Sequence, residues 1–347
     1  MKLFIISPGL SAGGAEKNLI WLANKLSQNF KVHLIILTNN SVKQELVLDE
    51  NVNLNILNSK KSFGSTLKLS KLINKEKPDV LISSIINGNF VTSLAKLFST
   101  TNPKHVIRLS TNINNLMKDS FKVKIYTLFS LLLSNQLVIL SDNNMDKIQK
   151  SLINKITFNK IYRKSVKIEL PFEIKKKEVN KDSTDFKAIT TSRLVKEKNL
   201  DFVIKQIKEF QKKDNLMFYI YGEGPYENQL KKVCIGTENI FFMGHIQMSE
   251  INFFEYDVFI FGSTSEGSPN SVIEALSNRL PCLIPSEITD TLPSGLQNIS
   301  YNYDFGNSLS FQENLSNALF DKQRKEYKSL SNVEHVVNMW KEVINSE

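Results

Sequence analysis

Two carboxylates, Glu266 and Glu274, stand eight residues apart in the stretch 263–277 (Ser-Thr-Ser-Glu-Gly-Ser-Pro-Asn-Ser-Val-Ile-Glu-Ala-Leu-Ser). The stretch predicts a helix that begins between them, because Ser268 is a favoured N-cap residue and Pro269 is favoured at the first helical position. The next three backbone N–H groups would lack intrahelical acceptors and, with the helix dipole, would attract an anion. These groups belong to Asn270, Ser271 and Val272. Carboxylates repel phosphate, so we expect hydroxyl groups beside them, as in a diphosphate flanked by a sugar and a ribose. The alternative is a capped surface helix without a ligand.

A cationic loop precedes this stretch in the same half of the chain. Arg193-Leu-Val-Lys-Glu-Lys198 follows an expected strand at residues 186–192 and precedes an expected helix at residues 201–212. A guanidinium binds phosphate bidentately and an ammonium binds it as a point charge. The loop therefore predicts a diphosphate site, and the alternative is an exposed helix start.

A glycine-containing loop near the N-terminus could also approach a phosphate. Residues 2–7 are expected to form a buried strand, and Gly13-Gly14-Ala15-Glu16 leads from it into a helical pattern. A strand, a glycine loop and a helix in that order can bring backbone N–H groups close to an anion. Many such turns contain glycines for conformational reasons alone.

Strands and helices alternate along the whole chain, which predicts doubly wound parallel sheets and an α/β fold. Ligands of such sheets bind beyond the carboxyl ends of the strands. In the first half these ends are expected at residues 7–14, 83–89 and 108–115. The expected strands cover residues 2–7, 32–37, 52–57, 78–82, 105–109, 137–140, 166–171, 186–192, 216–221, 257–261 and 281–285.

The stretch from Glu266 to Glu274 resembles the E-x7-E signature of retaining GT-B-fold glycosyltransferases of family 4, the glycosyl transferases group 1. Arg193 and Lys198 resemble the diphosphate-binding pair of that family, and Gly-Gly-Ala-Glu16 resembles its first loop. The resemblance implies two Rossmann-like domains that face a cleft. Residues 1–172 would bind the acceptor, residues 173–330 would bind the nucleotide sugar, and a helix at 331–347 would pack back on the first domain.

The resemblance also implies roles for individual residues. Glu274 would bind the ribose, Glu266 would bind and orient the donor sugar, and Arg193 and Lys198 would stabilise the leaving diphosphate. Glu266, Arg193 and Lys198 are therefore the expected catalytic residues. The remaining expected donor-binding residues are Gly13, Gly14, Gly244, His245, Ile246, Gly267, Ser268, Pro269, Asn270, Ser271 and Val272.

The chain departs from the family pattern at two places. Many members have a histidine after the strand at 105–109, where this chain has Ser110-Thr111-Asn112, so no catalytic histidine is assigned. Arg108 and Asn112, together with Glu16, are the expected contacts to the acceptor or sugar. Arg279 stands where the family has a glycine, and Asn278 is expected to take the left-handed conformation instead.

The predicted function is retaining transfer of a hexose or N-acetylhexosamine from a UDP-sugar, without a metal or other cofactor. The expected acceptor is a polyprenyl-diphosphate-linked glycan in bacterial O-antigen or capsule synthesis. A GT-B-fold nucleotide-sugar epimerase and a non-catalytic binding subunit are the alternatives. Nucleic acid is not an expected partner, because no aromatic-plus-basic RNA-binding motif is present.

The charge is unevenly distributed. The net charge is +9, but residues 1–170 carry 24 Lys/Arg against 10 Asp/Glu, which is +14. A basic half suggests contact with an anionic surface, whereas the alternative is a solvated lysine-rich surface. The apolar run 121–133 is too short to span a bilayer. We favour a buried helix there over a helix lying on a membrane with Lys118, Lys122 and Lys124 at its edge, since its apolar positions run nearly all round.

Two cysteines and the lack of a signal peptide predict a protein of the reducing cytoplasm. Peripheral contact with the inner face of the cytoplasmic membrane is expected through the basic first domain. Cys234 and Cys282 have no metal-binding spacing.

Overall fold

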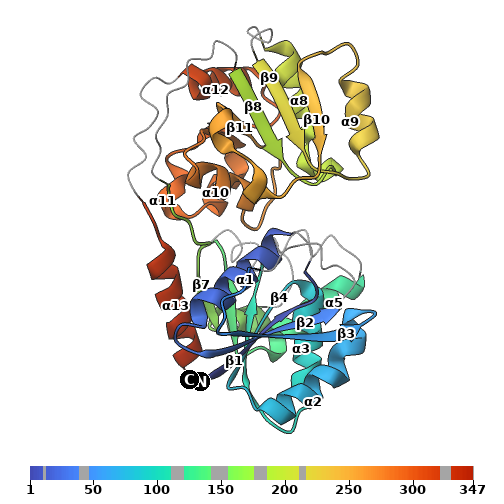
Figure 1. Cartoon of the computed structure of the whole chain (residues 1–347), viewed down its shortest axis with the longest axis vertical. Helices are drawn as coiled ribbons and strands as arrows, with labels where there is room; N and C mark the ends of the chain where they lie inside the picture. The colour runs from blue at the N-terminus through green and yellow to red at the C-terminus, as the bar shows by residue number, and fades with distance from the viewer. Residues whose placement is uncertain are drawn as a thin grey trace. The chain divides into compact units, whose positions relative to one another are not determined.

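The computed structural model describes residues 1–10, 13–38, 47–110, 121–141, 155–175, 186–210, 216–320 and 330–346. The chain forms two compact units, Met1–Leu170 with Glu334–Glu347, and Pro171–Val333 (Figure 1). Each unit contains one parallel sheet with helices packed on it. The predicted α/β fold with two Rossmann-like domains is therefore confirmed.

A seven-stranded sheet in the order β3-β2-β1-β4-β5-β6-β7 organises the first unit, and all neighbouring strands are parallel. Leu3, Phe4, Ile5 and Ile6 are all fully buried, as expected for a strand covered on both faces. The strand order reverses between β1 and β4, which is where ligands of such sheets bind. The strands are β1 (Lys2–Ser7), β2 (Lys31–Thr38), β3 (Val52–Ser59), β4 (Val80–Ser84), β5 (Lys104–Arg108), β6 (Gln136–Ile139) and β7 (Ser165–Lys167).

Helices cover both faces of this sheet. Helix α1 (Gly14–Leu26) and helix α13 (Val333–Asn345) share one core, to which Leu22 and Trp340 contribute. Lys104 holds the end of α13, because its Nζ donates to the carbonyl oxygens of Val343 (2.7 Å) and Ser346 (2.6 Å). The remaining α-helices of this unit contribute to other cores than the one shared by α1 and α13. They are α2 (Thr66–Glu76), α3 (Ile86–Leu97), α5 (Phe121–Leu133) and α7 (Lys155–Tyr162), and the short helix η1 (Ser62–Ser65) precedes α2.

The second unit contains a six-stranded parallel sheet in the order β10-β9-β8-β11-β12-β13. Its strands are β8 (Phe186–Thr191), β9 (Leu216–Tyr221), β10 (Ile240–Gly244), β11 (Val258–Ile260), β12 (Cys282–Pro285) and β13 (Tyr301–Tyr303). Its helices are η2 (Lys196–Lys198), α8 (Leu200–Glu209), α9 (Glu227–Val233), η4 (Met248–Glu250), η5 (Phe253–Glu255), α10 (Asn270–Ser277), η6 (Ser286–Thr291), α11 (Ser294–Gln297) and α12 (Ser308–Phe320).

Two segments lie side by side where the chain enters and leaves the second unit. Glu173 and Ser331 form an antiparallel bridge, and the Phe172 N–H donates to Asn332 Oδ1 at 2.7 Å. The change of unit falls after Leu170, two residues before the predicted boundary. The chain continues with the polar and charged segment that begins at Ile174, of which residues 176–185 lie outside the described residues.

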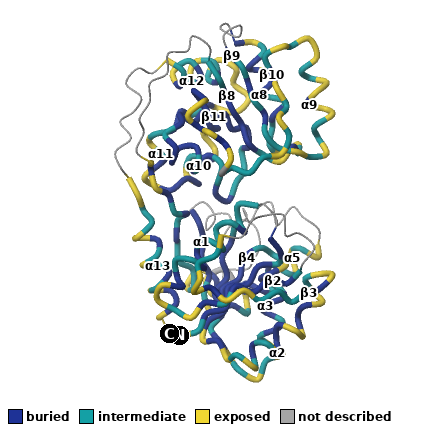
Figure 2. The backbone as a smooth tube through the Cα atoms, in the orientation of Figure 1, coloured by how far each residue is buried: buried dark blue, intermediate teal, exposed yellow. Residues whose placement is uncertain are grey.

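Helix α5 has the predicted bounds, but the preference for burial was wrong for most of it. Only Thr127, Ser130 and Leu131 are buried, whereas Phe121 is 78% exposed and Ile125 is 47% exposed (Figure 2). The apolar positions do run nearly all round the helix, but the sheet covers only one side. No helix among the described residues is long and apolar enough to cross a membrane.

Candidate active site

The loop that carries Arg193 is fixed by the turn after β9. The Ser192 N–H donates to the Tyr221 carbonyl (3.0 Å), and the Leu194 N–H donates to the Glu223 carbonyl (2.9 Å). A Cβ atom at Gly224 would lie 2.2 Å from the Leu194 carbonyl oxygen, so only glycine permits this approach. Arg193 itself is exposed, and its side chain has no hydrogen bond to any described residue. Its guanidinium is therefore available to an anion.

A second close approach joins the Lys198 loop to the loop after β11. Asn199 takes the left-handed conformation (φ 49°), which Asn tolerates better than most residues, and its Nδ2 donates to the Gly262 carbonyl at 3.0 Å. A Cβ atom at Gly262 would lie 2.6 Å from the Lys198 carbonyl oxygen. Neither contact was predicted from the sequence, although an Asn directly before a helix was a signal for the first.

These loops bring two of the predicted catalytic residues together. Lys198 Nζ and Glu266 Oε1 form an ion pair at 2.5 Å, and their side chains are 22% and 19% exposed. Lys198 Nζ also lies 5.7 Å from the centroid of the Phe261 ring, within the range of a cation–π contact. The site thus holds one partly buried, paired cation at Lys198 and one exposed cation at Arg193.

The start of α10 differs from the prediction. Pro269, with φ −83° and ψ 86°, is the N-cap, so the helix begins at Asn270. The predicted capping role of Ser268 was wrong, because its Oγ donates instead to the Thr291 carbonyl at 3.2 Å. The Val272 N–H was also wrongly predicted to be free, since it donates to the Pro269 carbonyl at 3.1 Å. The Ser271 N–H has no acceptor among the described residues.

Other residues of the E-x7-E stretch lie on both sides of the start of α10. Glu274 lies in the second turn of α10 and is half-buried, and Gly267 is buried in the loop before it. Tyr303 holds the start of the loop that follows β11, because its hydroxyl donates to the Phe261 carbonyl at 2.9 Å. Burial raises the pKa of Tyr303, which keeps the hydroxyl protonated as a donor. Sequence analysis did not identify this residue.

The end of α10 corrects another prediction. Arg279, rather than Asn278, takes the left-handed conformation, with φ 60°. Asn278 has φ −89° because its Nδ2 donates back to the Glu274 carbonyl at 2.7 Å. Arg279 Nε donates to the Lys175 carbonyl at 2.6 Å, which offsets part of the cost of about 1 kcal/mol for the left-handed residue.

Three of the predicted donor-binding residues lie at the end of β10 and directly after it. Gly244 has φ 73°, and its carbonyl accepts a hydrogen bond of 2.8 Å from the Gly222 N–H at the end of β9. His245 is exposed and Ile246 is half-buried. The three residues therefore lie at the same edge of the sheet as the Arg193 loop.

The predicted residues of the first unit lie at the carboxyl edge of its sheet. Gly13 is the N-cap of α1, Gly14 begins the helix, and Glu16 is buried in its first turn. Arg108, at the end of β5, is 4% exposed, and its Nη1 has no hydrogen-bond partner among the described residues. Burial lowers the pKa of Arg108 to about 10, so it stays charged near neutral pH. Asn112 lies outside the described residues.

His105 belongs to a buried polar network. Its Nε2 lies 2.8 Å from Ser83 Oγ, which in turn donates to Asn89 Oδ1 at 2.8 Å. Because the Ser83 hydroxyl donates to Asn89, His105 must donate its Nε2–H to Ser83. Burial, followed by the nearby Lys96 and Lys164, lowers the pKa of His105 to about 3. His105 is therefore a neutral structural residue.

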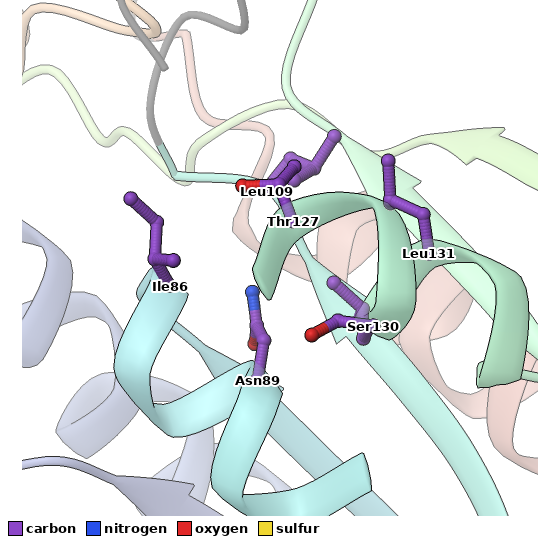
Figure 3. A pocket seen from close by; sticks show the side chains of 7 residues that line it. Ile86, Asn89, Leu109, Thr127, Ser130 and Leu131 are labelled. Atoms are coloured by element: carbon purple, nitrogen blue, oxygen red, sulfur yellow. The ribbon is translucent and has the colours of Figure 1, made fainter. Parts of the chain in front are cut away.

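A cavity of about 10 Å³ lies beside this network, between α3, α5 and the end of β5 (Figure 3). Asn89, Thr127 and Ser130 give it a polar side, and Thr127 Oγ1 has no hydrogen-bond partner in the part of the chain that the structure describes. Its size matches a single water molecule. The cavity is too small for a sugar or a nucleotide.

Comparisons with known proteins agree with this geometry. Residues 171–289, which hold Arg193, Lys198, Glu266 and Glu274, match the model of the family described as Glycosyl transferases group 1. The chain is similar to Anabaena Alr3699/HepE, solved in complex with UDP-glucose, with a TM-score of 0.75 and 12% identity, covering 99% of this chain and 98% of that one. The fold is that of the GT-B glycosyltransferases, and the family match supports a group 1 glycosyltransferase.

Two curated relatives match parts of the sequence. An uncharacterized glycosyltransferase of Methanocaldococcus jannaschii, MJ1059, is 28% identical over 242 residues, which cover 64% of this chain and 59% of that protein. The UDP-N-acetylglucosamine–peptide N-acetylglucosaminyltransferase GtfA subunit of Streptococcus pneumoniae is 35% identical over 102 residues, which cover 28% of this chain and 20% of the relative. The chain thus spans less than two thirds of the length of either relative.

Proposed function

We propose that the protein is a retaining glycosyltransferase that moves a hexose or N-acetylhexosamine from a UDP-sugar to a glycan acceptor. The observation that carries this proposal is the contact of Lys198 with Glu266, in a loop next to the exposed Arg193. A cation pair suits a diphosphate, and a carboxylate beside it suits sugar hydroxyls. The choice of UDP is supported by the UDP-glucose in the HepE structure and by the name of the GtfA subunit, a UDP-N-acetylglucosamine-dependent transferase.

In the proposed reaction the acceptor hydroxyl oxygen bonds to the anomeric carbon as the bond from that carbon to the diphosphate oxygen breaks. The departing phosphate takes the acceptor's proton, so no separate base is required. Arg193, Lys198 and the Ser271 N–H would stabilise the charge that develops on the diphosphate, which is electrostatic catalysis. In this proposal no metal or other cofactor is needed, because the protein's own cations hold the leaving group.

Replacing Glu274 by alanine is expected to weaken UDP binding by about tenfold or more. A carboxylate that accepts hydrogen bonds from ribose hydroxyls contributes roughly 1.5–3 kcal/mol. Calorimetric titration of UDP, GDP and ADP into the wild type and the variant measures the effect. Glu209→Ala, an exposed acid in the last turn of α8, is the control and should bind UDP like the wild type. Equal UDP affinity of Glu274→Ala and wild type would contradict the donor site, and preference for GDP or ADP would contradict the assigned base.

We propose that the first unit binds the acceptor and that Arg108 holds an anionic group on it. A buried guanidinium nitrogen that lacks a hydrogen-bond partner is costly for folding, and Arg108 Nη1 has none among the described residues, so its place at the carboxyl edge of the sheet favours a ligand. A diphosphate-linked glycan on a polyprenyl carrier would supply such a group. The +14 charge of the first half is consistent with that class of acceptor.

Arg108→Met is expected to raise KM for a short-chain polyprenyl diphosphate N-acetylglucosamine about tenfold while KM for the donor stays unchanged. The same variant is expected to be as stable as the wild type or up to about 2 kcal/mol more stable, since methionine keeps the apolar stem and removes a buried charge that has no ion pair among the described residues. Steady-state kinetics and urea unfolding measure the two effects. A destabilised variant with an unchanged acceptor KM would assign Arg108 a structural role instead.

The epimerase alternative can be separated by product analysis. An epimerase converts the donor sugar without an acceptor, whereas the proposed transferase leaves the intact sugar on UDP or hydrolyses it slowly. A binding subunit would bind UDP-sugar and produce neither product.

A further inference from the structure

One surface of the first unit carries exposed apolar side chains that the proposed active site does not use. Phe63 of η1 is 62% exposed, and Phe121 and Ile125 of α5 are 78% and 47% exposed. Half-buried rings link Phe63 to α5, because Phe90 of α3 stacks on Tyr126 of α5 with centroids 3.7 Å apart, and the Phe90 centroid lies 6.4 Å from that of Phe63. We call these five residues the aromatic patch. Helices α2, α3 and α5 lie next to one another beneath it (Figure 1).

The chain segments around the aromatic patch are strongly basic. Residues 58–75, 86–98 and 121–135 contain no Asp or Glu. Lys122 and Lys124 are exposed on α5 between Phe121 and Ile125, and Lys122 Nζ lies 5.4 Å from the centroid of the Tyr126 ring. The lysines of these segments are Lys60, Lys61, Lys68, Lys71, Lys75, Lys96, Lys122 and Lys124. A face that is both apolar and cationic is complementary to a surface that is apolar and anionic.

We propose that the aromatic patch docks the first unit on an anionic lipid bilayer. Phe121 and Ile125 would enter the boundary between headgroups and acyl chains, and Lys122 and Lys124 would contact the anionic headgroups. Exposed apolar residues that occur singly are ordinary, but a contiguous group marks a contact surface. The lysines favour a lipid surface over an apolar protein face, because α3 and α5 contain no Asp or Glu and the one acid of α2, Glu76, is paired with Lys2 at 3.0 Å. This surface deepens the proposed transfer to a lipid-linked acceptor, although its residues are independent of the donor site.

Flotation with vesicles tests the proposal without any sugar donor. The wild-type protein is expected to float with vesicles of phosphatidylcholine and phosphatidylglycerol, to remain unbound with phosphatidylcholine alone, and to be released by salt. Lys122→Gln and Lys124→Gln should each weaken binding about fivefold, and together about 25-fold. Phe121→Ser with Ile125→Ser should weaken binding by a similar amount through lost apolar burial.

Two exposed residues of the second unit provide matched controls. Lys205→Gln on α8 removes the same charge, and Leu309→Ser on α12 removes an apolar side chain that is 75% exposed. Both variants should bind vesicles like the wild type. Wild-type protein that fails to bind the anionic vesicles, or patch variants that bind as well as the controls, would overturn the proposal. The proposal would also be overturned if the wild type self-associated without binding vesicles and Phe121→Ser abolished that self-association. The aromatic patch would then bind a second copy of the chain.

Calorimetric UDP titration of the same variants keeps this result separate from the proposed function. Patch variants that lose vesicle binding should keep the UDP affinity of the wild type, because no patch residue belongs to the second unit. If the wild-type protein did not bind UDP, the proposed donor site would be contradicted, but the conclusion from vesicle binding would be unaffected.

Discussion

Lys198→Met is expected to lower kcat about 10²–10³-fold, because in the proposed reaction it removes a cation that stabilises the charge developing on the leaving diphosphate. Methionine keeps an apolar stem against the Phe261 ring and removes only the ammonium. The loss should fall mainly on kcat, since an interaction that strengthens in the transition state contributes to the rate rather than to ground-state binding. Steady-state kinetics with saturating UDP-sugar measure the effect.

Lys196→Met is the matched control for this prediction. Lys196 lies in the same short helix η2, two residues away, and is exposed without an ion pair among the described residues. It should keep kcat within about twofold of the wild type. If both variants lost activity equally, the effect would come from the net charge of the loop and not from the position of Lys198. If Lys198→Met kept its kcat, the proposed stabilisation of the leaving group would be wrong.

The contact between Lys198 and Glu266 adds a constraint on how the donor enters. Without a ligand, the two side chains satisfy each other at 2.5 Å. A diphosphate would compete with Glu266 for the Lys198 ammonium, which frees carboxylate oxygens for sugar hydroxyls. In the proposed reaction, donor binding therefore requires the Lys198 ammonium to exchange Glu266 for a diphosphate oxygen, and the ion pair keeps the two side chains next to each other before that exchange.

The sequence was informative where local pattern decides the structure. Alternating apolar runs and helical periods predicted the parallel sheets, since buried strands are recognisable from their own residues. Glu266, Glu274, Arg193 and Lys198 were identified because their types and spacing carry chemistry. The structure shows that Lys198 and Glu266 meet, whereas the roles proposed for these four residues still require the experiments above.

The sequence failed where contacts over long separations decide. Ser268 is a good N-cap by type, but its hydroxyl is used by Thr291, which lies 23 residues later. The exposure of α5 could not be predicted, because an apolar helix does not reveal which side the sheet covers. Asn199 and Gly262 meet across 63 residues, and no local period signals such a contact.

Acid is expected to destabilise the first unit through His105. The unfolded pKa of histidine is about 6.5, whereas burial lowers the pKa of His105 to about 3 in the folded protein. Between these values the unfolded chain binds a proton that the folded protein excludes. The stabilisation is therefore complete above pH 6.5 and is lost as the pH falls toward 3, by at most about 1.4 kcal/mol for each pH unit. From pH 7 to pH 5 we expect a loss of about 2 kcal/mol in the free energy of unfolding.

Urea unfolding followed by tryptophan fluorescence measures this loss in the first unit alone. The chain has two tryptophans, Trp21 and Trp340, and both pack in the core of that unit. His105→Gln is the informative variant, because a glutamine amide can still donate to Ser83 Oγ but does not titrate. Its loss of stability between pH 7 and pH 5 should be about 2 kcal/mol smaller than that of the wild type.

Other groups of the first unit add to the acid sensitivity, His33 between pH 7 and pH 5 and the carboxylates only below about pH 5. Burial lowers the pKa of His33, and hydrogen bonds lower the pKa values of Asp49 and Glu76, so each of these also makes acid destabilising. His335→Gln, which changes an exposed histidine on α13, should keep the full pH dependence of the wild type. If His105→Gln and His335→Gln lost stability equally with acid, His105 would not be the buried neutral group that the Ser83 contact requires. The distinction also bears on catalysis. A buried histidine whose pKa is lowered to about 3 is neutral near pH 7, so it cannot serve as a general acid there.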